Sequence, residues 1–533
     1  MWSNTAKITI NRGRETVQVL DEDVTVKRFT LVILMALIAL SMLICCAAPV
    51  PEPPSEFKVT SLAVTPIVVE PGQTVTINAV VKNTGQRESS CPLTLTVNGV
   101  EEEVKDVIVA PGATEILAFT LVRDASGMYE IEVDGLTETL RVKQAGAYPR
   151  LGNYYAGGNA FYWHPWLIES AQLSSLARWD LIVVHYDVAR SAPESIGRIK
   201  ELNPQAKILA WFPAGLCDYS QLHSVQSRNE SWFLHYGDTP GNPKPPEERR
   251  VILWTSKTDD VEFAGMNPAS EWSIYLPQFV HDNVMSTDLF DGVFYDCLWE
   301  TMWLSNIDID NDGITDSSAV VNREYQEGMA WLLQLTRELL GPEAIILGNP
   351  GVEWSANSPY FDYANGHMQE NALGTESWSS HDFAKVWDIY QRNMQKAEPP
   401  SRIHWIAVDT NSVPYDPVNP DLLAADLQKM RYGLAIALLG DSYYGFDIGD
   451  GFHSELWWFP EYDANLGLAK GNAQKCSDGT WMREFENGVV VANPTSKEST
   501  IEFPAIHKDV TTGIEGLQFM VPPEDGRIFV ISD

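Results

Sequence analysis

Two acidic side chains close short apolar runs in the middle of the chain. Asp296 ends the run FDGVFYD, and Glu370 ends the run FDYANGHMQE. If each run is a strand of a barrel, both carboxyl groups lie at the strand ends, where barrel enzymes carry their reacting groups. Hydrolysis of a glycosidic bond needs two carboxyl groups, one to protonate the leaving oxygen and one to attack the sugar or activate water. We predict Asp296 as nucleophile or base and Glu370 as acid, with Glu300 as an alternative for the second role.

Other polar and aromatic residues near predicted strand ends are candidates for binding substrate. Carboxylates that close apolar runs can bind sugar hydroxyls, although each can instead cap a helix or hold a loop. Trp rings can stack on the C–H faces of pyranose sugars, although most Trp residues of a barrel belong to its core. The predicted substrate-binding residues are Asp187, Trp211, Trp299, Asn349, His367, Asp409 and Asp447.

The segment DIDNDGITD, after the predicted fourth strand, has acidic residues at the spacing of a calcium loop. Side chains at alternate positions converge on a hard cation, and Gly313 permits the sharp bend. The position of the bidentate Glu of an EF-hand is taken by Ala319, so another residue or water must complete the shell. We expect a structural Ca²⁺ and no organic cofactor, and the alternative is a solvated acidic loop. The predicted ligands are Asp308, Asp310, Asp312, Ile314 and Asp316.

The elements that must position these residues lie between residues 148 and 474. Apolar runs alternate there with amphipathic stretches, which predicts βαβ units and a parallel sheet. The eight runs are RLGNYY, DLIVVHYD, KILAWFPA, DGVFYD, AIILGNP, FDYANGHMQE, IHWIAVD and SYYGFDIG. Eight units over about 300 residues predict a (β/α)8 TIM barrel with an insertion around residues 216–270. A doubly wound open sheet is the alternative, but no GxGxxG or P-loop turn follows the first run.

Two regions with the pattern of antiparallel strands flank the predicted barrel, so the chain is expected to be multidomain. Residues 56–145 contain short alternating stretches separated by PG, TG and NG turns, which predicts an Ig-like β-sandwich. Residues 475–533 read as strands again, as in WMREFENGVVVANP, and predict a small C-terminal β-sandwich.

An apolar run at residues 29–48 has the length of a bilayer span and follows a Lys-Arg pair. It is expected to be a transmembrane signal anchor, or a lipoprotein signal acylated at Cys45 or Cys46. Residues 1–28 are then a short cytoplasmic tail or a mis-started prefix, and residues 49–55 are a Pro-rich linker. Positive charge before the run places the bulk of the chain outside the cell, anchored at the cell surface.

The charge of the chain excludes some partners. Lys and Arg number 37 against 72 Asp and Glu, which gives a net charge of -35. This charge repels phosphate backbones, so no nucleic acid is expected, and the membrane is expected to be contacted through the N-terminal segment. The sequence has no GxSxG and no HExxH motif, so serine and zinc hydrolase mechanisms have no support.

Two parts of the chain resemble known families. The segment from about residue 149 to the end is similar to the glycoside-hydrolase-like barrels related to the alpha-galactosidase superfamily, in particular the grouping numbered fifteen. The residues that carry this likeness are RLGNYYAGG, FDGVFYDCLWE, ILGNPG, FDYANGHMQEN and WMREFENGVVVANPT. The resemblance implies that Asp296 is the nucleophile and that the proton donor closes the sixth strand. The donor is usually an Asp, whereas this chain has Glu370, one methylene longer.

The N-terminal region resembles the cell-adhesion-related domain of bacterial surface proteins, known as CARDB. The segments that carry this likeness are LAVTPIVVEPGQTVTINAVVKNTG, VIVAPGATEILAFTL and GMYEIEVDGL. The resemblance implies a spacer or adhesion module without catalytic residues.

These observations lead to two hypotheses about function. The first is an extracellular, membrane-tethered glycoside hydrolase that acts on a polysaccharide or glycoconjugate. The alternative is a non-catalytic surface protein that binds carbohydrate or mediates adhesion. The separation of the two carboxyl groups discriminates between them, because glycosidases hold theirs roughly 5 to 9.5 Å apart.

Overall fold

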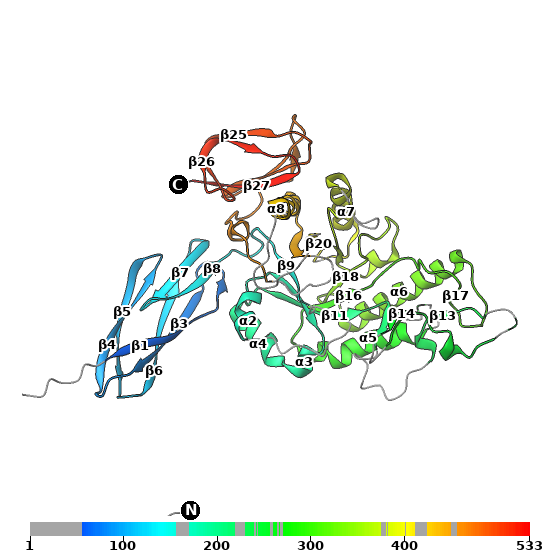
Figure 1. The fold of residues 1–533 in the computed structure, drawn as a ribbon, viewed down its shortest axis with the longest axis horizontal. Helices are drawn as coiled ribbons and strands as arrows, with labels where there is room; N and C mark the ends of the chain where they lie inside the picture. Colours follow the sequence, from blue (N-terminus) through cyan, green and yellow to red (C-terminus); the bar gives the residue numbers. More distant parts are fainter. Residues whose placement is uncertain are drawn as a thin grey trace, which may run out of the picture. The chain divides into compact units, whose positions relative to one another are not determined.

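The structure is a computed structural model that describes most of the chain beyond residue 55 (Figure 1). The described residues are 56–155, 170–218, 230–238, 241, 243–255, 260–263, 266, 270–374, 380, 382–399, 401–410, 424–448 and 456–532. The predicted segments at residues 1–28, 29–48 and 49–55 lie outside them. Within these ranges, no helix combines the length and the apolar character that crossing a bilayer requires.

Eight parallel strands form the central sheet, one from each predicted run. They are β9 (Gly152–Tyr155), β10 (Leu181–His185), β11 (Lys207–Pro213), β16 (Gly292–Asp296), β18 (Ile345–Gly348), β19 (Gly366–Gln369), β20 (Ile403–Thr410) and β21 (Tyr443–Ile448). Their order in the sheet is their order in the chain. The first and last strands also meet, because the Tyr444 backbone N–H donates to the Arg150 carbonyl over 3.0 Å. The sheet is therefore a nearly closed barrel, as predicted, and the open doubly wound alternative is wrong.

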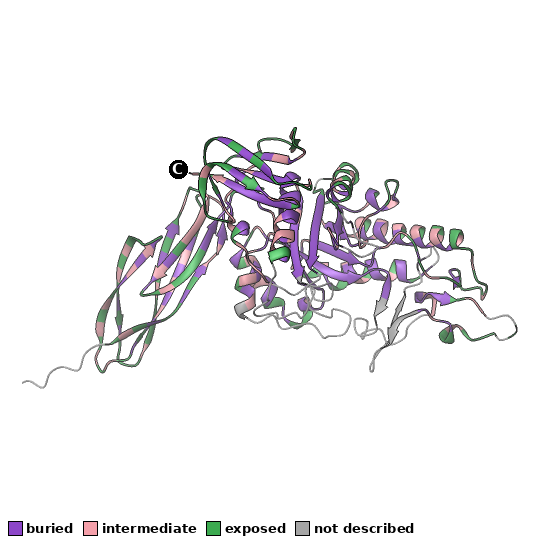
Figure 2. Cartoon of the chain, turned by 45° about the horizontal axis from the view of Figure 1, so that its top comes forward, coloured by how far each residue is buried: buried purple, intermediate pink, exposed green. Residues whose placement is uncertain are grey.

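The barrel strands are buried along nearly their whole length, as Figure 2 shows. Alternate side chains point into the barrel and out toward the helices. Trp405 fills part of the interior, and two glycines give it room: a Cβ at Gly152 would lie 2.8 Å from the Trp405 ring, and one at Gly445 would lie 2.9 Å from its Nε1. Both glycines are therefore required by close packing.

Helices connect most of the barrel strands. They are α2 (Ser170–Leu176), α3 (Val188–Ser191), α4 (Pro193–Leu202), α5 (Trp272–Asn283), α6 (Ser318–Leu340), α7 (Phe383–Lys396) and α8 (Ala424–Leu439). Two begin at side-chain caps: Ser317 Oγ accepts from the Val320 N–H before α6, and Asp382 Oδ1 accepts from the Lys385 N–H before α7. Short 3₁₀ turns supplement them at Glu230–Trp232, Pro246–Glu248, Met285–Thr287, Pro359–Asp362 and Pro460–Asp463.

The predicted insertion after the third barrel strand is confirmed. It contains β12 (Leu216–Asp218), β13 (His235–Tyr236), β14 (Ile252–Thr255) and β15 (Asp260–Phe263). Strands β12, β15 and β14 form a small antiparallel sheet, and β13 pairs with β17 (Ile307–Asp308). The β13–β17 pair ties this insertion to the loop after the fourth barrel strand, where the predicted calcium ligands lie.

The N-terminal domain consists of β-strands, as predicted. They are β1 (Phe57–Thr65), β2 (Val68–Val69), β3 (Thr74–Asn83), β4 (Ser89–Val97), β5 (Val100–Val109), β6 (Thr114–Val122), β7 (Gly127–Val133) and β8 (Leu136–Val142). They form a sheet in the order β1-β3-β6 and a sheet in the order β2-β8-β7-β4-β5. The period-two pattern of the sequence is the pattern of burial along β3, where buried and more exposed residues alternate.

The C-terminal domain differs from the prediction of a sandwich. Its strands are β22 (Gln474–Lys475), β23 (Trp481–Phe485), β24 (Gly488–Asn493), β25 (Ser499–Asp509), β26 (Glu515–Val521) and β27 (Asp525–Ile531). They form one antiparallel sheet in the order β22-β23-β24-β27-β25-β26. The reason is β25, which pairs with β26 through Ile501 and, after an irregularity between Glu502 and His507, with both β26 and β27. One long strand therefore joins what the sequence pattern suggested were two layers.

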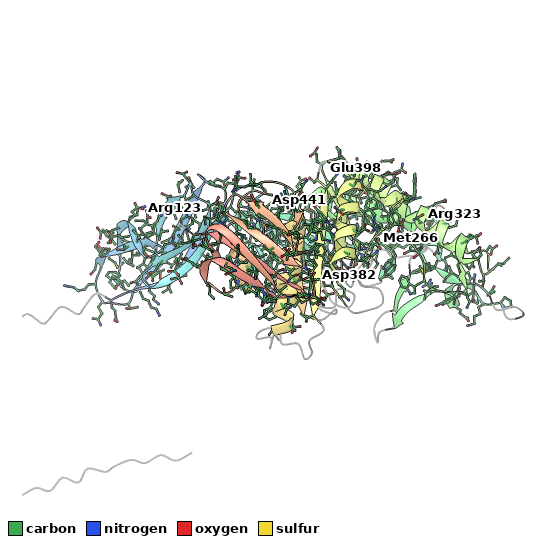
Figure 3. The ribbon with its side chains drawn as sticks, turned by 90° about the horizontal axis from the view of Figure 1, so that it is seen from above. Arg123, Met266, Arg323, Asp382, Glu398 and Asp441 are labelled. Atoms are coloured by element: carbon green, nitrogen blue, oxygen red, sulfur yellow. The ribbon has the colours of Figure 1, made fainter. Side chains whose placement is uncertain are left out.

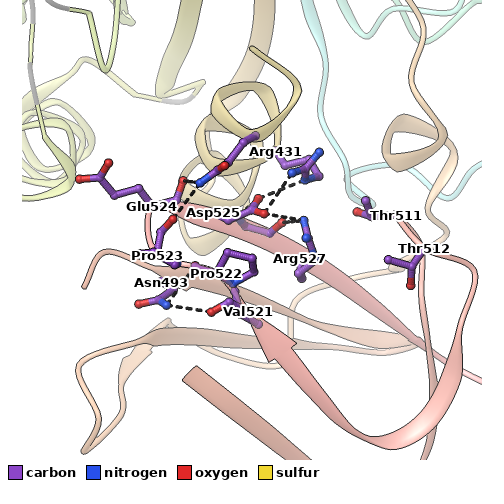
Figure 4. A network of polar contacts seen from close by, with 12 residues as sticks. Arg431, Asn493, Thr511, Thr512, Val521, Pro522, Pro523, Glu524, Asp525 and Arg527 are labelled. Carbon is purple, nitrogen blue, oxygen red and sulfur yellow. Dashed lines mark hydrogen bonds and ion pairs between the residues drawn. The ribbon is translucent and has the colours of Figure 1, made fainter. Parts of the chain in front are cut away.

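Helix α8 holds the C-terminal sheet on the barrel. From Tyr432 to Leu439 its residues are buried on all sides, because β20 and β21 cover one face and β24 and β27 the other. Arg431 of α8 donates to both carboxylate oxygens of Asp525, over 3.1 and 3.0 Å, and Arg527 Nη1 lies 2.8 Å from the same carboxylate (Figure 4). Gly526 follows, and a Cβ there would lie 2.4 Å from the Arg431 carbonyl oxygen. The close contact therefore requires glycine.

Candidate active site

The carboxyl ends of the barrel strands carry a layer of polar side chains above an apolar interior. The interior consists of one cluster of side chains that includes Phe294, Leu347, Met368 and Ala407. Since successive residues of a strand point to opposite faces, the residue two positions after each also points inward. The inward positions near this end of the eight strands include Tyr154, His185, Trp211, Asp296, Asn349, Glu370, Asp409 and Asp447, of which Asn349 and Glu370 directly follow their strands.

Asp296, the last residue of β16, is 8% exposed and is held by four hydrogen-bond donors. Its Oδ2 accepts from the Tyr154 hydroxyl over 2.7 Å and from Trp211 Nε1 over 3.1 Å. Its Oδ1 accepts from the Cys297 N–H over 2.8 Å and from Asn349 Nδ2 over 2.9 Å. Donors on both oxygens fix the orientation of the carboxyl group and stabilise its ionised form.

Asn349 joins Asp296 to Glu370. Its Nδ2 donates to Asp296 Oδ1 and, over 3.1 Å, to Glu370 Oε2, so these two oxygens lie at most about 6.0 Å apart. The amide is oriented by its own oxygen, which accepts from the Gly351 N–H over 2.8 Å. The two acids predicted from the sequence therefore face one another at the end of the barrel.

Burial, and after it the charge of Glu370, raise the pKa of Asp296 above its usual value. The hydrogen bonds from Tyr154, Cys297 and Trp211 act in the opposite direction. Tyr154 remains a hydroxyl donor, because burial and the Asp296 carboxylate raise its pKa well above 10. Two carboxyl groups held side by side suit a site where one acid acts as nucleophile and the other as proton donor.

His185 packs beside this network as a neutral ring. Burial lowers its pKa to about 4, and its ring centroid lies 5.4 Å from that of Trp211. Its Nδ1 accepts from the Asp187 backbone N–H over 3.2 Å, which leaves the proton on Nε2. The ring therefore supports Trp211 without adding charge next to the two acids.

Two predicted site residues, Glu300 and His367, have other positions or roles. Glu300 accepts from the Ser355 N–H and hydroxyl and from Gln326 Nε2, so it holds the loop after β18 to α6. His367 points out of the barrel, where it packs against Trp354, and burial lowers its pKa to about 3. The prediction that His367 binds substrate is therefore wrong. His367 and Glu370 are an odd number of positions apart along the extended chain, so their side chains point to opposite faces.

Trp211 belongs to the site, but the predicted stacking on sugar does not fit its position. The side chain is fully buried, and its Nε1 donates to Tyr154 and Asp296 over 2.5 and 3.1 Å. No face of the ring is open to a sugar in this arrangement. Trp211 is therefore a positioning residue for Asp296.

The other predicted substrate-binding residues lie at the same end of the barrel. Asp409 and Asp447 are directly opposite one another on β20 and β21, and both are buried. Asp187 forms a two-point ion pair with Arg190 over 2.6 and 2.8 Å. Trp299 is half-buried in the loop after β16, where it packs edge-on against another Trp, with ring centroids 4.5 Å apart.

Sequence reasoning did not find Tyr154, although its hydroxyl binds Asp296. The run RLGNYY does not mark Tyr154, because a strand buried on both faces shows no alternation that would separate inward from outward residues.

The predicted calcium loop brings three carboxylates together. One oxygen from each of Asp308, Asp310 and Asp316 lies within 4.8 Å of the others. Asp308 is buried, and its Oδ2 also accepts from Arg249 Nη1 over 2.7 Å. Asp312 lies outside this group, and its Oδ1 accepts from the Ile314 N–H over 2.7 Å. Carboxylate oxygens are the donors that Ca²⁺ prefers, so the three carboxylates fit such an ion.

Comparison with known families gives two matches. Residues 200–489, more than half of the chain, match the model described as hypothetical glycosyl hydrolase family 15. The chain belongs to this family. Residues 55–135 match the CARDB domain. Family 15 membership, with the barrel and its pair of acids, makes the chain a glycoside hydrolase-like, carbohydrate-active enzyme.

Solved structures give remote likenesses to this family 15 chain. A cycloisomaltooligosaccharide glucanotransferase of Paenibacillus is 11% identical, with a TM-score of 0.36, over 90% of this chain and 70% of that one. A CARDB domain from Pyrococcus furiosus is 20% identical, with a TM-score of 0.14, over 18% of this chain and 96% of that one. No curated protein matches the chain. TM-scores this low carry no argument about substrate.

The coupling of the two acids predicts a titration effect. Glu370→Gln removes the negative charge that opposes ionisation of Asp296, so the pKa of Asp296 should fall while burial still keeps it raised. The measurement is the ¹³C carboxyl shift of Asp-labelled protein against pH, with the signal assigned through Asp296→Asn. Glu300→Gln is the matched control and should leave the titration unchanged. An Asp296 signal that titrates identically with and without the Glu370 charge would contradict the coupling.

Proposed function

We propose that the chain is a retaining glycoside hydrolase that acts on a polysaccharide or glycoconjugate. The observation that carries the proposal is the single Asn349 amide that binds both Asp296 and Glu370. It limits the distance between Asp296 Oδ1 and Glu370 Oε2 to at most about 6.0 Å, which favours the closer spacing of retaining enzymes, roughly 5 to 5.5 Å between carboxyl groups, over the roughly 6.5 to 9.5 Å of inverting ones. A surface protein that only binds carbohydrate has no need for two acids held in this way.

The proposed reaction has two steps. In the first, a carboxylate oxygen of Asp296 bonds to the anomeric carbon, the glycosidic C–O bond breaks, and the Glu370 carboxyl gives its proton to the leaving oxygen. In the second, water attacks the anomeric carbon, Glu370 takes a proton from that water, and the bond to Asp296 breaks. The hydrogen bonds from Tyr154 and Trp211 hold Asp296 Oδ2 in position. They also stabilise the negative charge that returns to the Asp296 carboxylate when its bond to the sugar breaks.

Asp187, Asp409, Asp447 and Trp299 are proposed to bind the sugar around the reacting bond. Asp409 lies on β20, which pairs with the strand that leads to Glu370, and Asp447 lies opposite it on the next strand, β21. Carboxylates there can accept hydrogen bonds from sugar hydroxyls, and the half-buried Trp299 can pack on a C–H face. Asn349, already bound to both acids, is proposed to orient them and to contact the sugar between them.

The test of this proposal is hydrolysis of a glycan panel. Asp296→Asn should lower kcat by about 10³-fold or more, because Asn cannot form the glycosyl ester, and Glu370→Gln by about 10²- to 10⁴-fold on substrates with poor leaving groups. Glu300→Gln is the control and should keep near-native turnover. For the nucleophile variant, added azide should restore turnover and yield a glycosyl azide of inverted configuration. Binding of glycans without turnover by the native chain would overturn the proposal and favour a binding protein.

We propose that the loop at residues 308–316 binds a structural Ca²⁺. The carboxylates of Asp308, Asp310 and Asp316 would hold the ion, with the Ile314 carbonyl and Asp312 as the further predicted ligands. Burial, and then the neighbouring Asp312, Asp316 and Asp308, raise the pKa of Asp310, and a bound cation would relieve that repulsion. When bound, the ion would fix the insertion that β13 and β17 join, and it takes no part in the reaction.

Added Ca²⁺ should therefore stabilise the native chain. At a free concentration about 100 times its Kd the gain is about 2.7 kcal/mol, measured as a rise in Tm and in resistance of the loop to proteolysis. Asp310→Asn and Asp316→Asn should abolish the gain, while Asp312→Asn tests whether that side chain joins the shell. Equal stabilisation of the native chain by Mg²⁺, or none by either ion, would contradict a calcium site.

We also propose that residues 29–48 tether the chain to the membrane, with the CARDB and barrel domains outside the cell. The support is the apolar length of the run and the Lys-Arg pair before it. The CARDB domain is then proposed as a spacer or adhesion module between the membrane and the enzyme.

The tether can be tested by expressing the whole chain in bacteria. It should sediment with membranes and be degraded by protease added to intact cells or spheroplasts, whereas deletion of residues 29–48 should leave it soluble in the cytoplasm. Labelling with palmitate that is lost in Cys46→Ser or Cys45→Ser would identify a lipid anchor. Recovery of the whole chain in the soluble cytoplasmic fraction would rule out the tether.

A further inference from the structure

A groove of about 840 Å³ lies between the barrel helices α7 and α8 and the C-terminal sheet. Its size falls within the roughly 300 to 1,000 Å³ of ligand sites in proteins. The barrel side is formed by the first halves of α7 and α8, and the other side by residues of the C-terminal domain that include Trp481 and Glu524. None of the proposed catalytic residues lines it.

Aromatic rings from both domains meet in this groove. Trp481 of β23 lies 5.4 Å from Trp387 and 5.5 Å from Phe383 of α7, measured between ring centroids. Trp387 and Trp481 are only half-buried, so part of each ring remains open. Polar groups surround them: Gln391 and Asp388 are exposed on the same face of α7. Open aromatic faces beside amide and carboxylate groups suit a ligand that is apolar on one face and rich in hydroxyls at its edge, as a sugar ring is.

The charges of the groove argue against an anionic ligand. Asp382, which caps α7 and is labelled in Figure 3, lines it together with Asp388 and Glu524, against Lys429 and Lys475. The Lys429 ammonium is also engaged, since its Nζ donates to the Asp409 carbonyl over 2.5 Å. The chain as a whole carries a net charge of -35. A neutral glycan is therefore favoured over a uronate or a phosphorylated sugar.

The groove opens at the same end of the barrel as the catalytic pair. In a (β/α)8 barrel each helix begins where the preceding strand ends, so the first turns of α7 and α8 lie beside the ends of β19 and β20. One short connection along the chain and one hydrogen bond agree with this placement. Leu373, which lines the groove, is three residues from Glu370, and the lining residue Lys429 binds the backbone of Asp409.

The outer wall of the groove is fixed in place. Gln428, which also lines it, donates to the Pro523 carbonyl over 2.8 Å and to the Glu524 carbonyl over 3.2 Å. One turn further along α8, Arg431 binds Asp525 as Figure 4 shows. The wall is therefore held by contacts with α8 and does not depend on a ligand.

We infer that this groove binds sugar units of a neutral glycan chain some distance from the bond cleaved at Asp296 and Glu370. This inference rests on the proposed function for the position of the cleaved bond, but binding in the groove does not require turnover. It makes the preferred substrate a polymer or a long oligosaccharide, because a short glycoside that occupies the barrel mouth gains nothing from the groove.

The test compares binding and hydrolysis in groove variants. Whole chains are run in native gels that contain dextran, starch, xylan, galactomannan or β-1,3-glucan. At least one polysaccharide should retard the native chain, and Trp481→Ala should weaken that binding by about tenfold. Trp331→Ala, which removes an exposed Trp of α6 away from the groove, is the matched control and should bind as the native chain does.

A second variant distinguishes a loss of ligand contacts from a loss of packing in Trp481→Ala. Ala384 is an exposed residue of α7 in the groove, so Ala384→Met fills space without removing a contact. It should also reduce retardation, and both variants should raise KM for the polysaccharide while kcat/KM for a short aryl glycoside stays within about twofold.

The outcomes separate the inference from the proposed function. Native-like retardation of both groove variants, or no retardation of the native chain in any of the five gels, would overturn the inference even if Asp296 proves essential for hydrolysis. Retardation that the groove variants lose, in a chain that hydrolyses nothing, would support the groove and reject the proposed function.

Discussion

The site depends on keeping two acids close together in a place that is poor in water. A buried carboxylate beside a second carboxylate is costly, and the cost is met by the four donors on Asp296, one of which Glu370 shares through Asn349. Tyr154 and Trp211 can serve as donors only because the barrel interior beneath them is filled. Tyr154 packs on Phe294 with ring centroids 5.0 Å apart. Gly152 and Gly445 make room for the Trp405 ring. They therefore allow the dense interior on which the donors and the two acids are held.

The barrel was predictable because its strands are apolar runs, but the same property hides which residues face inward. A strand buried on both faces shows no alternation, so neither the outward position of His367 nor the inward position of Glu370 can be read from the run FDYANGHMQE. The acids were predictable because each closes such a run, and the strand ends are where barrel enzymes carry their reacting groups. Trp211 was misjudged for the opposite reason, since a Trp suits both a core and a sugar site.

Features built from distant parts of the chain were beyond the sequence. The groove takes residues from the starts of α7 and α8 and from the C-terminal sheet, about 90 residues further on, and no local pattern joins them. The single sheet of the C-terminal domain was missed because β25 has the length and alternation of an ordinary strand. Its pairing with strands on both sides depends on an irregularity that has no sequence signal of its own.

Helix α8 shows that the C-terminal sheet is part of the enzyme and not an appended module. A helix on the outside of a barrel normally keeps a polar face toward water, whereas α8 buries every residue from Tyr432 to Leu439, a stretch of about two turns. Without the sheet, its outer apolar face would be exposed and Arg431 would lose Asp525. The same helix follows β20, which carries Asp409, and through Lys429 it holds the backbone of that residue. The sheet therefore stabilises, through one helix, both the rim of the catalytic mouth and the groove beside it.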